Sequence, residues 1–376
     1  MGHTSESPEP AHRVRAYHRW QLGISLLGLA VGIGYLGVLL ATGVAGALGD
    51  ALMRATPHWW LTVPALVLIL AGAYRLITLP LLWVSGFWLP RRFGLSHQPV
   101  RDWVADVLKA VLVGSAIMVA AVEIIYALLR TTPWWWLWSA AALWIGAALL
   151  ALVAPVWLMP LFYRLTPLVD AGLRERLVAL ARRTGAPVLG VWVADHSRKG
   201  RAANAAVTGL GRTRRVILFD TLVRDFPPDE VEAVLAHELA HHLHRDIWRG
   251  LGVQAAVFGA AFGAAALILR VGGPALGLTG PADHAGVPLL GLALLGVSLL
   301  AVPAVNAWSR RCERRADEFA LRTASRPRAF VEAMERLASL NLAERDPHPV
   351  KEFLLYSHPS VGRRIARAKA LLGAQV

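Results

Sequence analysis

Long stretches without charge constrain this chain more than any other feature. Residues 20–49 contain no charged side chain, and a transmembrane helix needs only about 20 apolar residues. Five further apolar stretches follow at about 58–86, 106–129, 134–157, 250–270 and 286–308. Charged residues make up 17% of the chain, below the roughly 25% of soluble proteins. We therefore predict a mainly α, polytopic membrane protein with about six transmembrane helices.

Positive charge is concentrated on one side of the predicted spans. Lys and Arg number 3 in residues 1–19, 3 in 87–105, 14 in 158–249 and 14 in 307–376. The other side holds Arg54 and Arg130, with Arg270 at a boundary. Because positively charged loops of membrane proteins stay in the cytoplasm, we expect the large polar segment and the C-terminal region there. The same rule accounts for the net charge of +14, so nucleic acid is not expected as a partner.

The spans divide the chain into five predicted regions. These are a cytoplasmic tail (1–19), a four-helix transmembrane region (20–157), a cytoplasmic segment (158–249), a transmembrane hairpin (250–308) and a cytoplasmic helical segment (309–376). In the first cytoplasmic segment, residues 188–195 and 215–223 are rich in β-branched side chains and predict strands. Residues 227–246 predict a helix that begins with proline and acidic residues. We therefore expect a cytoplasmic α+β domain that the transmembrane hairpin divides.

Two further features of composition bear on the class of protein. Arg outnumbers Lys 35 to 4, which is typical of a GC-rich gene and favours a multi-pass protein of a bacterial cell membrane. The single cysteine, Cys312, excludes an intrachain disulfide and a metal site made of several thiolates. Arg75 and Glu123 lie inside predicted spans, where charged groups usually face a polar interior or one another. The alternative is that their side chains reach the membrane surface, or that the ends of the spans are slightly displaced.

A metal-binding pattern lies on the predicted helix 227–246. Residues 237–241 read His-Glu-Leu-Ala-His, and positions i and i+4 lie one above the other on a helix. His237 and His241 are therefore placed to bind one tetrahedral zinc ion, with Glu238 close enough to act on a water at that metal. His242 points away from this face. His244, at i+7 from His237, shares it and is one candidate for a third ligand.

A carboxylate after the last apolar stretch is the preferred third ligand. Glu313 and Asp317 are spaced i, i+4, so both project from one helix face. Between His241 and Glu313 the chain crosses the membrane twice, which returns it to its starting side, and a helical hairpin keeps its two open ends adjacent. Two histidines, one glutamate and an open position make a catalytic zinc site. Asp317 is expected to hold a ligand imidazole by its other nitrogen; the alternative is a salt bridge to a neighbouring arginine, Arg314 or Arg315.

These segments together resemble a known family. HELAHH (237–242) and NAWSRRCERRADEFA (306–320) resemble the type I CaaX prenyl-endopeptidases, which are integral-membrane zinc metallopeptidases of the gluzincin type, related to HtpX-type proteases. Further similar segments, in the order of the family, lie at 91–109, 160–168, 204–223 and 357–365.

The resemblance implies roles for particular residues. It implies one zinc ion per chain, bound by His237, His241 and Glu313, with Glu238 as the general base. It also places Asn204 on an edge strand beside the substrate. His358 and Arg364 are implied to stand near the scissile bond and to contact the oxyanion or the substrate.

Three functions follow from these patterns. The first is a membrane-embedded zinc endopeptidase that hydrolyses peptides or membrane-associated proteins in the manner of a CaaX protease. The second keeps the site but acts on damaged membrane proteins, as HtpX-type proteases do; Ala206 and Ala240, which depart from the prenyl-protease pattern, leave the substrate open between the two. The third is a non-enzymatic transporter. The spans speak against it, because they lack the paired helices broken by Gly or Pro that mark a transport site.

Overall fold

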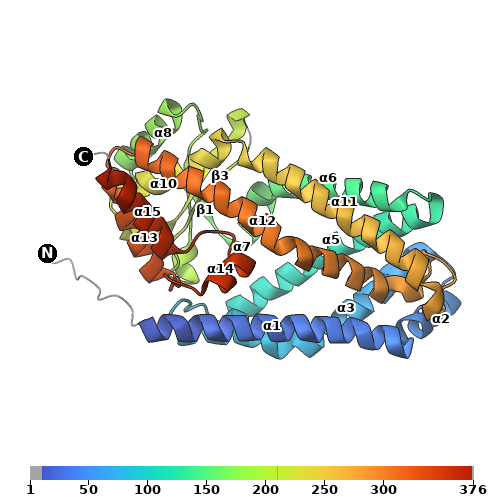
Figure 1. The fold of residues 1–376 in the computed structure, drawn as a ribbon. Coiled ribbons are helices and arrows are strands. Elements are labelled where there is room, and N and C mark those ends of the chain that lie inside the picture. The colour runs from blue at the N-terminus through green and yellow to red at the C-terminus, as the bar shows by residue number, and fades with distance from the viewer. Residues whose placement is uncertain (1–10, 210, 375–376) are drawn as a thin grey trace.

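The computed structural model describes residues 11–209 and 211–374. Six helices in this part of the chain are long and apolar enough to cross a bilayer, which confirms the predicted polytopic fold. They are α1 (Ala11–Thr42), α3 (Trp59–Trp83), α5 (Val100–Thr131), α6 (Trp135–Trp157), α11 (Asp246–Gly272) and α12 (Val287–Thr323). α3 continues through the π-helical turn η1 (Val84–Trp88) into α4 (Leu89–Arg92). Figure 1 shows the long helices running along the long axis of the molecule.

The N-terminal region differs from the sequence prediction in two respects. Residues 1–10 of the expected tail lie outside the described residues, and residues 11–19 already belong to α1. The apolar stretch 20–49 is not one helix, because α1 ends at Thr42 and α2 (Val44–Ala55) follows it. Between the two helices, Gly43 has φ +68°, a left-handed conformation that glycine adopts at little steric cost.

The membrane helices are held together by apolar side chains and by a few hydrogen bonds. Ile125, Trp135, Phe262 and Leu289 belong to one buried cluster that joins α5, α6, α11 and α12. The indole of Trp144 on α6 also donates a hydrogen bond to a carbonyl of α11 over 2.8 Å. The hairpin α11–α12 is therefore packed against the rest of the bundle, and its ends enter the extramembrane part at fixed positions.

A four-stranded sheet forms one layer of the extramembrane part. Its order is β1 (Leu165–Pro167), β2 (Val191–Ala194), β4 (Arg215–Phe219) and β3 (Ala205–Thr208), with β2 and β4 parallel and the outer pairs antiparallel. β2 and β4 lie within the two predicted strand segments. β4 is shorter than predicted because Asp220–Asp225 forms the short helix α9. β3 is an edge strand of this sheet.

Helices cover the sheet and enclose the apolar core. They are α8 (Ala171–Arg183), α10 (Pro228–Leu243), α13 (Arg328–Leu340) and α15 (Val361–Gly373). The short helix α14 (Pro349–Leu355) packs against α12 instead, and the short α7 (Met159–Phe162) lies at the end of α6. Leu177, Leu218, Leu235 and Phe330 are fully buried together, so segments before and after the transmembrane hairpin share one core. In Figure 1, α12 continues from the membrane bundle into this core, alongside α10 and α15.

The predicted helix 227–246 ends earlier than its sequence pattern indicates. α10 stops at Leu243, and α11 begins at Asp246 after a turn. Arg245 in this turn has φ +55°, which is uncommon for a residue with a side chain. The turn lets the chain leave α10 and enter the hairpin α11–α12, and it places Asp246 against the last turn of α10.

Candidate metal centre

The structure brings the three predicted metal ligands together. The ligand atoms of His237 and His241 on α10 and of Glu313 on α12 all lie within 4.8 Å of one another. Nε2 of His237 is 3.3 Å from Oε2 of Glu313, and Nε2 of His241 is 3.4 Å from Oε1 of the same carboxylate. Two imidazole nitrogens and one carboxylate oxygen thus converge from two helices, as in catalytic zinc sites with three protein ligands.

The surroundings of this cluster fit a bound cation. Oε2 of Glu313 is buried and has no hydrogen-bond partner among the described residues, and an unpartnered buried carboxylate oxygen is costly unless a cation satisfies it. His244, the alternative third ligand, is not part of the cluster as far as the chain is described. Its ring stacks edge-on against Phe319 at 5.9 Å between centroids.

Both imidazoles are held from behind by carboxylates. Nδ1 of His237 lies 2.9 Å from Oδ1 of Asp317, and Nδ1 of His241 lies 3.1 Å from Oδ2 of Asp246. A carboxylate on one ring nitrogen fixes the orientation of the ring and leaves the other nitrogen for the metal. The arrangement of Asp317 was expected from its spacing, whereas Asp246 was missed. The signal that could have found it is an acid just after the His-Glu-x-x-His helix, at the point where the chain turns.

Arg364 is engaged with Asp317. Its Nε lies 3.0 Å from Oδ2 and its Nη2 2.6 Å from Oδ1 of Asp317, a two-pronged pair, and Nη2 is 3.9 Å from Oε2 of Glu313. The side chain of Arg364 is 11% exposed, so the structure places it beside the three candidate ligands and behind His237. The alternative salt bridges of Asp317 to its neighbouring arginines do not form: Arg315 instead pairs with Asp246 at 2.8 Å.

His358 contacts the cluster directly, whereas Asn204 lies beside the sheet. Nε2 of His358 is 3.3 Å from Oε1 of Glu313, and this side chain is 58% exposed, so it stands at the open face of the site. Asn204 is exposed and directly precedes the edge strand β3. His242, which points away from the ligand face, contacts the Val207 carbonyl of that strand at 2.9 Å. α10 is therefore linked to the edge strand by a side chain of the motif itself.

Burial and neighbouring charges shift the pKa values of these groups. Burial disfavours charge on His237, but the carboxylates of Asp317 and Glu313 beside its ring outweigh it and raise its pKa to about 9. Burial raises the pKa of Glu238 and lowers that of His358. A carboxylate with a raised pKa is better able to accept a proton near neutral pH. A neutral His358 retains one N–H donor.

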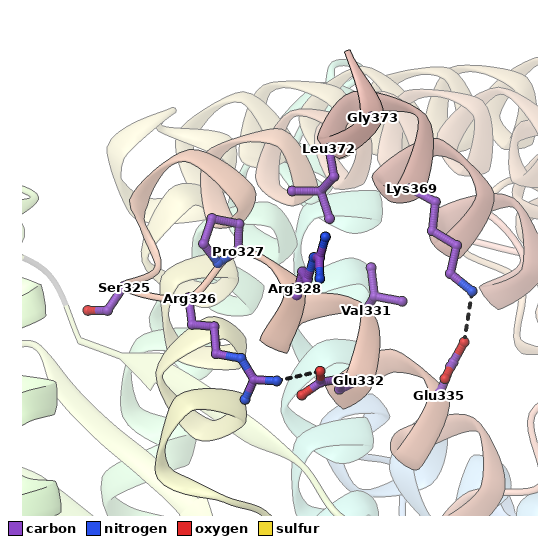
Figure 2. Close-up of a pocket in the computed structure, with 10 residues that line it drawn as sticks. All are labelled: Ser325, Arg326, Pro327, Arg328, Val331, Glu332, Glu335, Lys369, Leu372 and Gly373. Atoms are coloured by element: carbon purple, nitrogen blue, oxygen red, sulfur yellow. Dashed lines mark hydrogen bonds and ion pairs between the residues drawn. The ribbon is translucent and has the colours of Figure 1, made fainter. Parts of the chain in front are cut away.

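A separate hollow lies away from these residues. It has a volume of about 750 Å³ and lies between the start of α13 and the end of α15. Figure 2 shows Arg326 paired with Glu332 at 2.6 Å and Lys369 paired with Glu335 at 3.2 Å. None of the metal-cluster residues lines it, so we assign no chemistry to this hollow.

Comparison with known proteins agrees with the geometry. Residues 167–372 match Peptidase family M48, and residues 4–164 match a family described as CAAX prenyl protease N-terminal, five membrane helices. In that N-terminal region, four of the described helices are long enough to span a bilayer, and the short α2 lies between the first two.

Individual relatives resemble different shares of the chain. The uncharacterized metalloprotease YhfN of Bacillus subtilis is 28% identical over 88% of this chain and 79% of its own length. CAAX prenyl protease 1 of Saccharomyces cerevisiae is 35% identical over 46% of this chain and 39% of its own length. The crystal structure of S. mikatae Ste24p has the same fold, with a TM-score of 0.82 at 24% identity, and covers 96% of this chain and 92% of that one.

Proposed function

The chain belongs to Peptidase family M48 and is a membrane metalloendopeptidase, and from this we propose that His237, His241 and Glu313 bind one zinc ion and that Glu238 is the general base. The observation that carries the proposal is the convergence of the three ligand atoms within 4.8 Å of one another. Two imidazoles and one carboxylate are the ligand set of catalytic zinc.

We assign the steps of hydrolysis to this chain's own residues. A bound zinc ion supplies a Lewis acid at the cluster. Glu238 accepts a proton from the attacking water and delivers it to the leaving amine. His358 donates a hydrogen bond to the substrate carbonyl oxygen as negative charge develops there. The carboxylates of Asp317 and Asp246 hold the two imidazoles in place, and Arg364 holds Asp317.

The substrate is proposed to be an extended peptide that lies along β3. An edge strand offers unpaired backbone groups to such a peptide, and Asn204 stands at the start of this strand. A hollow of about 420 Å³ adjoins it, lined by Asn204 and Ala206 on one side and by Pro155, Leu158 and Phe162 on the other. Because the latter residues lie at the end of the membrane helix α6, the hollow favours apolar peptides of membrane-associated proteins, as for a CaaX-type protease.

We further propose that the site faces the cytoplasm of a bacterial cell membrane. The support is the distribution of charge in the short connections: residues 1–19 and 87–105 hold 3 Lys and Arg each, whereas the other side holds Arg54 and Arg130, with Arg270 at a boundary. Short segments rich in Lys and Arg stay on the cytoplasmic side.

The substrate proposal is tested with purified full-length protein in detergent or vesicles. The protein is incubated with a membrane proteome, and newly formed peptide ends are identified by mass spectrometry, with Glu238→Gln as the matched control. We expect ends that appear with the unsubstituted protein and not with the control, and that cluster in apolar segments near chain termini. Cleavage that is equally frequent with Glu238→Gln would overturn the proposal.

A further inference from the structure

The short helix α14 presents apolar side chains to its surroundings. Val350, Phe353, Leu354 and Leu355 are 57%, 54%, 39% and 50% exposed, in a helix of 7 residues. The opposite side of the helix is anchored, since Glu352 is buried and its Oε1 accepts a hydrogen bond from the Ser360 amide over 3.2 Å. α14 is thus a fixed helix with an uncovered apolar face.

Two side chains of α12 hold α14 in place, at the level where α12 leaves the membrane. Nδ2 of Asn306 donates to the carbonyl of Leu354 over 2.9 Å. One turn later, Nη1 of Arg310 donates to the carbonyls of Glu352 and Tyr356, at 3.1 and 2.5 Å. Since the apolar stretch of α12 ends near residue 308, α14 lies beside the boundary of the hydrocarbon region.

Exposed tryptophans mark the same boundary. Trp20, Trp88, Trp157 and Trp248 are 51%, 37%, 73% and 57% exposed, and each lies near the end of its helix that adjoins the extramembrane part. Tryptophan is enriched where membrane meets water. The ring of Trp308 on α12 lies against Gly250, two residues from Trp248, so the Asn306 attachment point is level with this belt. Figure 1 shows α14 at the junction between the membrane helices and the extramembrane part.

A positively charged hollow adjoins α14. It has a volume of about 260 Å³ and is lined by Arg310, Arg314, Arg363, Arg364 and Arg367, together with the carboxylates of Asp317 and Glu352. Five guanidinium groups face two carboxylates in this lining. Arg367 also pairs with Glu318 outside the lining, which still leaves an excess of positive charge. Arg314 has no ion-pair partner among the residues that the structure describes. Arg363 is 62% exposed and its Nε lies 3.4 Å from Oε2 of Glu352. Such a surface complements the phosphate of an anionic lipid.

We infer that α14 is seated in the headgroup region of the bilayer and that the arginines beside it bind the phosphate of anionic phospholipid. The apolar side chains then enter the membrane surface as in interfacial amphipathic helices. α14 ends at Leu355, and His358 follows three residues later, with its imidazole 3.3 Å from Glu313. Contact with the bilayer therefore positions His358 at the metal cluster. This last link rests on the proposed function, whereas the depth of α14 does not.

The depth is measured with the full-length protein in vesicles of phosphatidylcholine and phosphatidylglycerol. A nitroxide label is attached in Phe353→Cys, and in Leu189→Cys as a matched control, because Leu189 is similarly exposed at 60% but belongs to the loop before β2. We expect the label at 353 to be more accessible to oxygen than to a water-soluble nickel complex, and the label at 189 to show the reverse. A label at 353 that behaves like the control overturns the inference. So does shielding from both reagents that grows with protein concentration, since a second protein then covers α14.

The charge is tested with Arg314→Gln/Arg363→Gln in vesicles with and without phosphatidylglycerol. We expect phosphatidylglycerol to deepen the label at 353 and to increase turnover of an unprotected peptide, and both responses to be lost in the double variant at unchanged zinc content. Responses that persist in the double variant overturn the role of the arginines. Binding of lipid phosphate is also overturned if inorganic phosphate, added to vesicles of pure phosphatidylcholine, produces the same two responses as phosphatidylglycerol. If no peptide is cleaved under any condition, the proposed function fails while the depth measurement still decides the seating of α14.

Discussion

Asp246, the first residue of α11, holds the imidazole of His241, the last motif residue of α10, with Oδ2 3.1 Å from Nδ1. The contact depends on the turn between the two helices, in which Arg245 has φ +55°. Because Asp317 holds His237 in the same manner at 2.9 Å, each proposed histidine ligand has its own carboxylate. The start of one membrane helix and the end of the other therefore both support the metal cluster.

Replacing Asp246 by Asn should weaken zinc binding. The neutral amide of Asn accepts a weaker hydrogen bond from the imidazole of His241 than the carboxylate does. Loss of a carboxylate that holds a ligand histidine typically reduces metal affinity about 10–100-fold. Asp225→Asn is the matched control, because Asp225 pairs with Arg224 away from the cluster. Competition with a zinc chelator measures the affinity. Equal zinc affinity in Asp246→Asn and the unsubstituted protein would contradict the role of Asp246.

Replacing Arg364 by Lys separates two roles for that residue. Lysine keeps the charge but cannot form the two-pronged pair with Asp317, so a residue that positions Asp317 should lose zinc affinity on substitution, by about 5–30-fold. A residue that contacts only the oxyanion should lose kcat with unchanged zinc affinity. We expect the first result from the 2.6 and 3.0 Å contacts. Unchanged zinc affinity with reduced kcat would favour the second role.

Zinc affinity should fall as pH is lowered. In the metal-free protein, the pKa of His237 is raised to about 9, and zinc binds the neutral imidazole, so below pH 9 a proton must leave. For this one proton the apparent affinity falls about tenfold per pH unit. Calorimetry in buffers of different ionisation enthalpy should show proton release on zinc binding at neutral pH. No release at pH 7 would contradict a protonated His237.

The raised pKa of His237 also makes the stability of the metal-free protein depend on pH, but in the opposite direction to zinc affinity: stability falls as pH rises. A folded-state pKa raised above the ordinary histidine value of 6.5 contributes stability that is fully present below pH 6.5 and is lost as pH rises through about 9. Chelated protein should therefore unfold at a lower temperature above pH 9 than near pH 6.5, and His237→Asn should reduce this difference. An unchanged difference in His237→Asn would assign it to other groups.

Replacing His358 by Ala should lower kcat and leave zinc in place. A donor to the developing oxyanion contributes about 10²–10³ to kcat, and His358 stands at the open face of the cluster without being one of its three ligand candidates. Zinc content and kcat measured on the same sample check this. A loss of zinc equal to that in His237→Ala would show that His358 is a ligand instead.

Local patterns were sufficient to predict the spans and the proposed ligands. The i, i+4 spacing of His237 and His241 fixes their common face, and the two crossings between His241 and Glu313 return the chain to the same side. The structure brings these residues together as that argument expects. The six spans follow because a bilayer leaves few alternatives to a long apolar helix.

Contacts between distant segments could not be predicted in this way. Asp246 was missed because helical periodicity continues through residue 246, while the turn at Arg245 is set by the packing of α10 and α11. The pairing of Arg364 with Asp317 joins residues on α15 and α12, and no local pattern distinguishes it from a pairing with a neighbouring arginine. The break of the first apolar stretch at Gly43 was likewise invisible, since glycine is common throughout this chain.

The most direct test of the account measures zinc content and peptide hydrolysis on the same preparation of Glu238→Gln. Glu238 is proposed to move a proton without binding the metal, so the variant should retain about one zinc per chain while kcat falls about 10²–10⁴-fold. His237→Ala, prepared in parallel, should lose both. A Glu238→Gln variant that hydrolyses peptides at the unsubstituted rate, or one that has lost its zinc, would contradict the account.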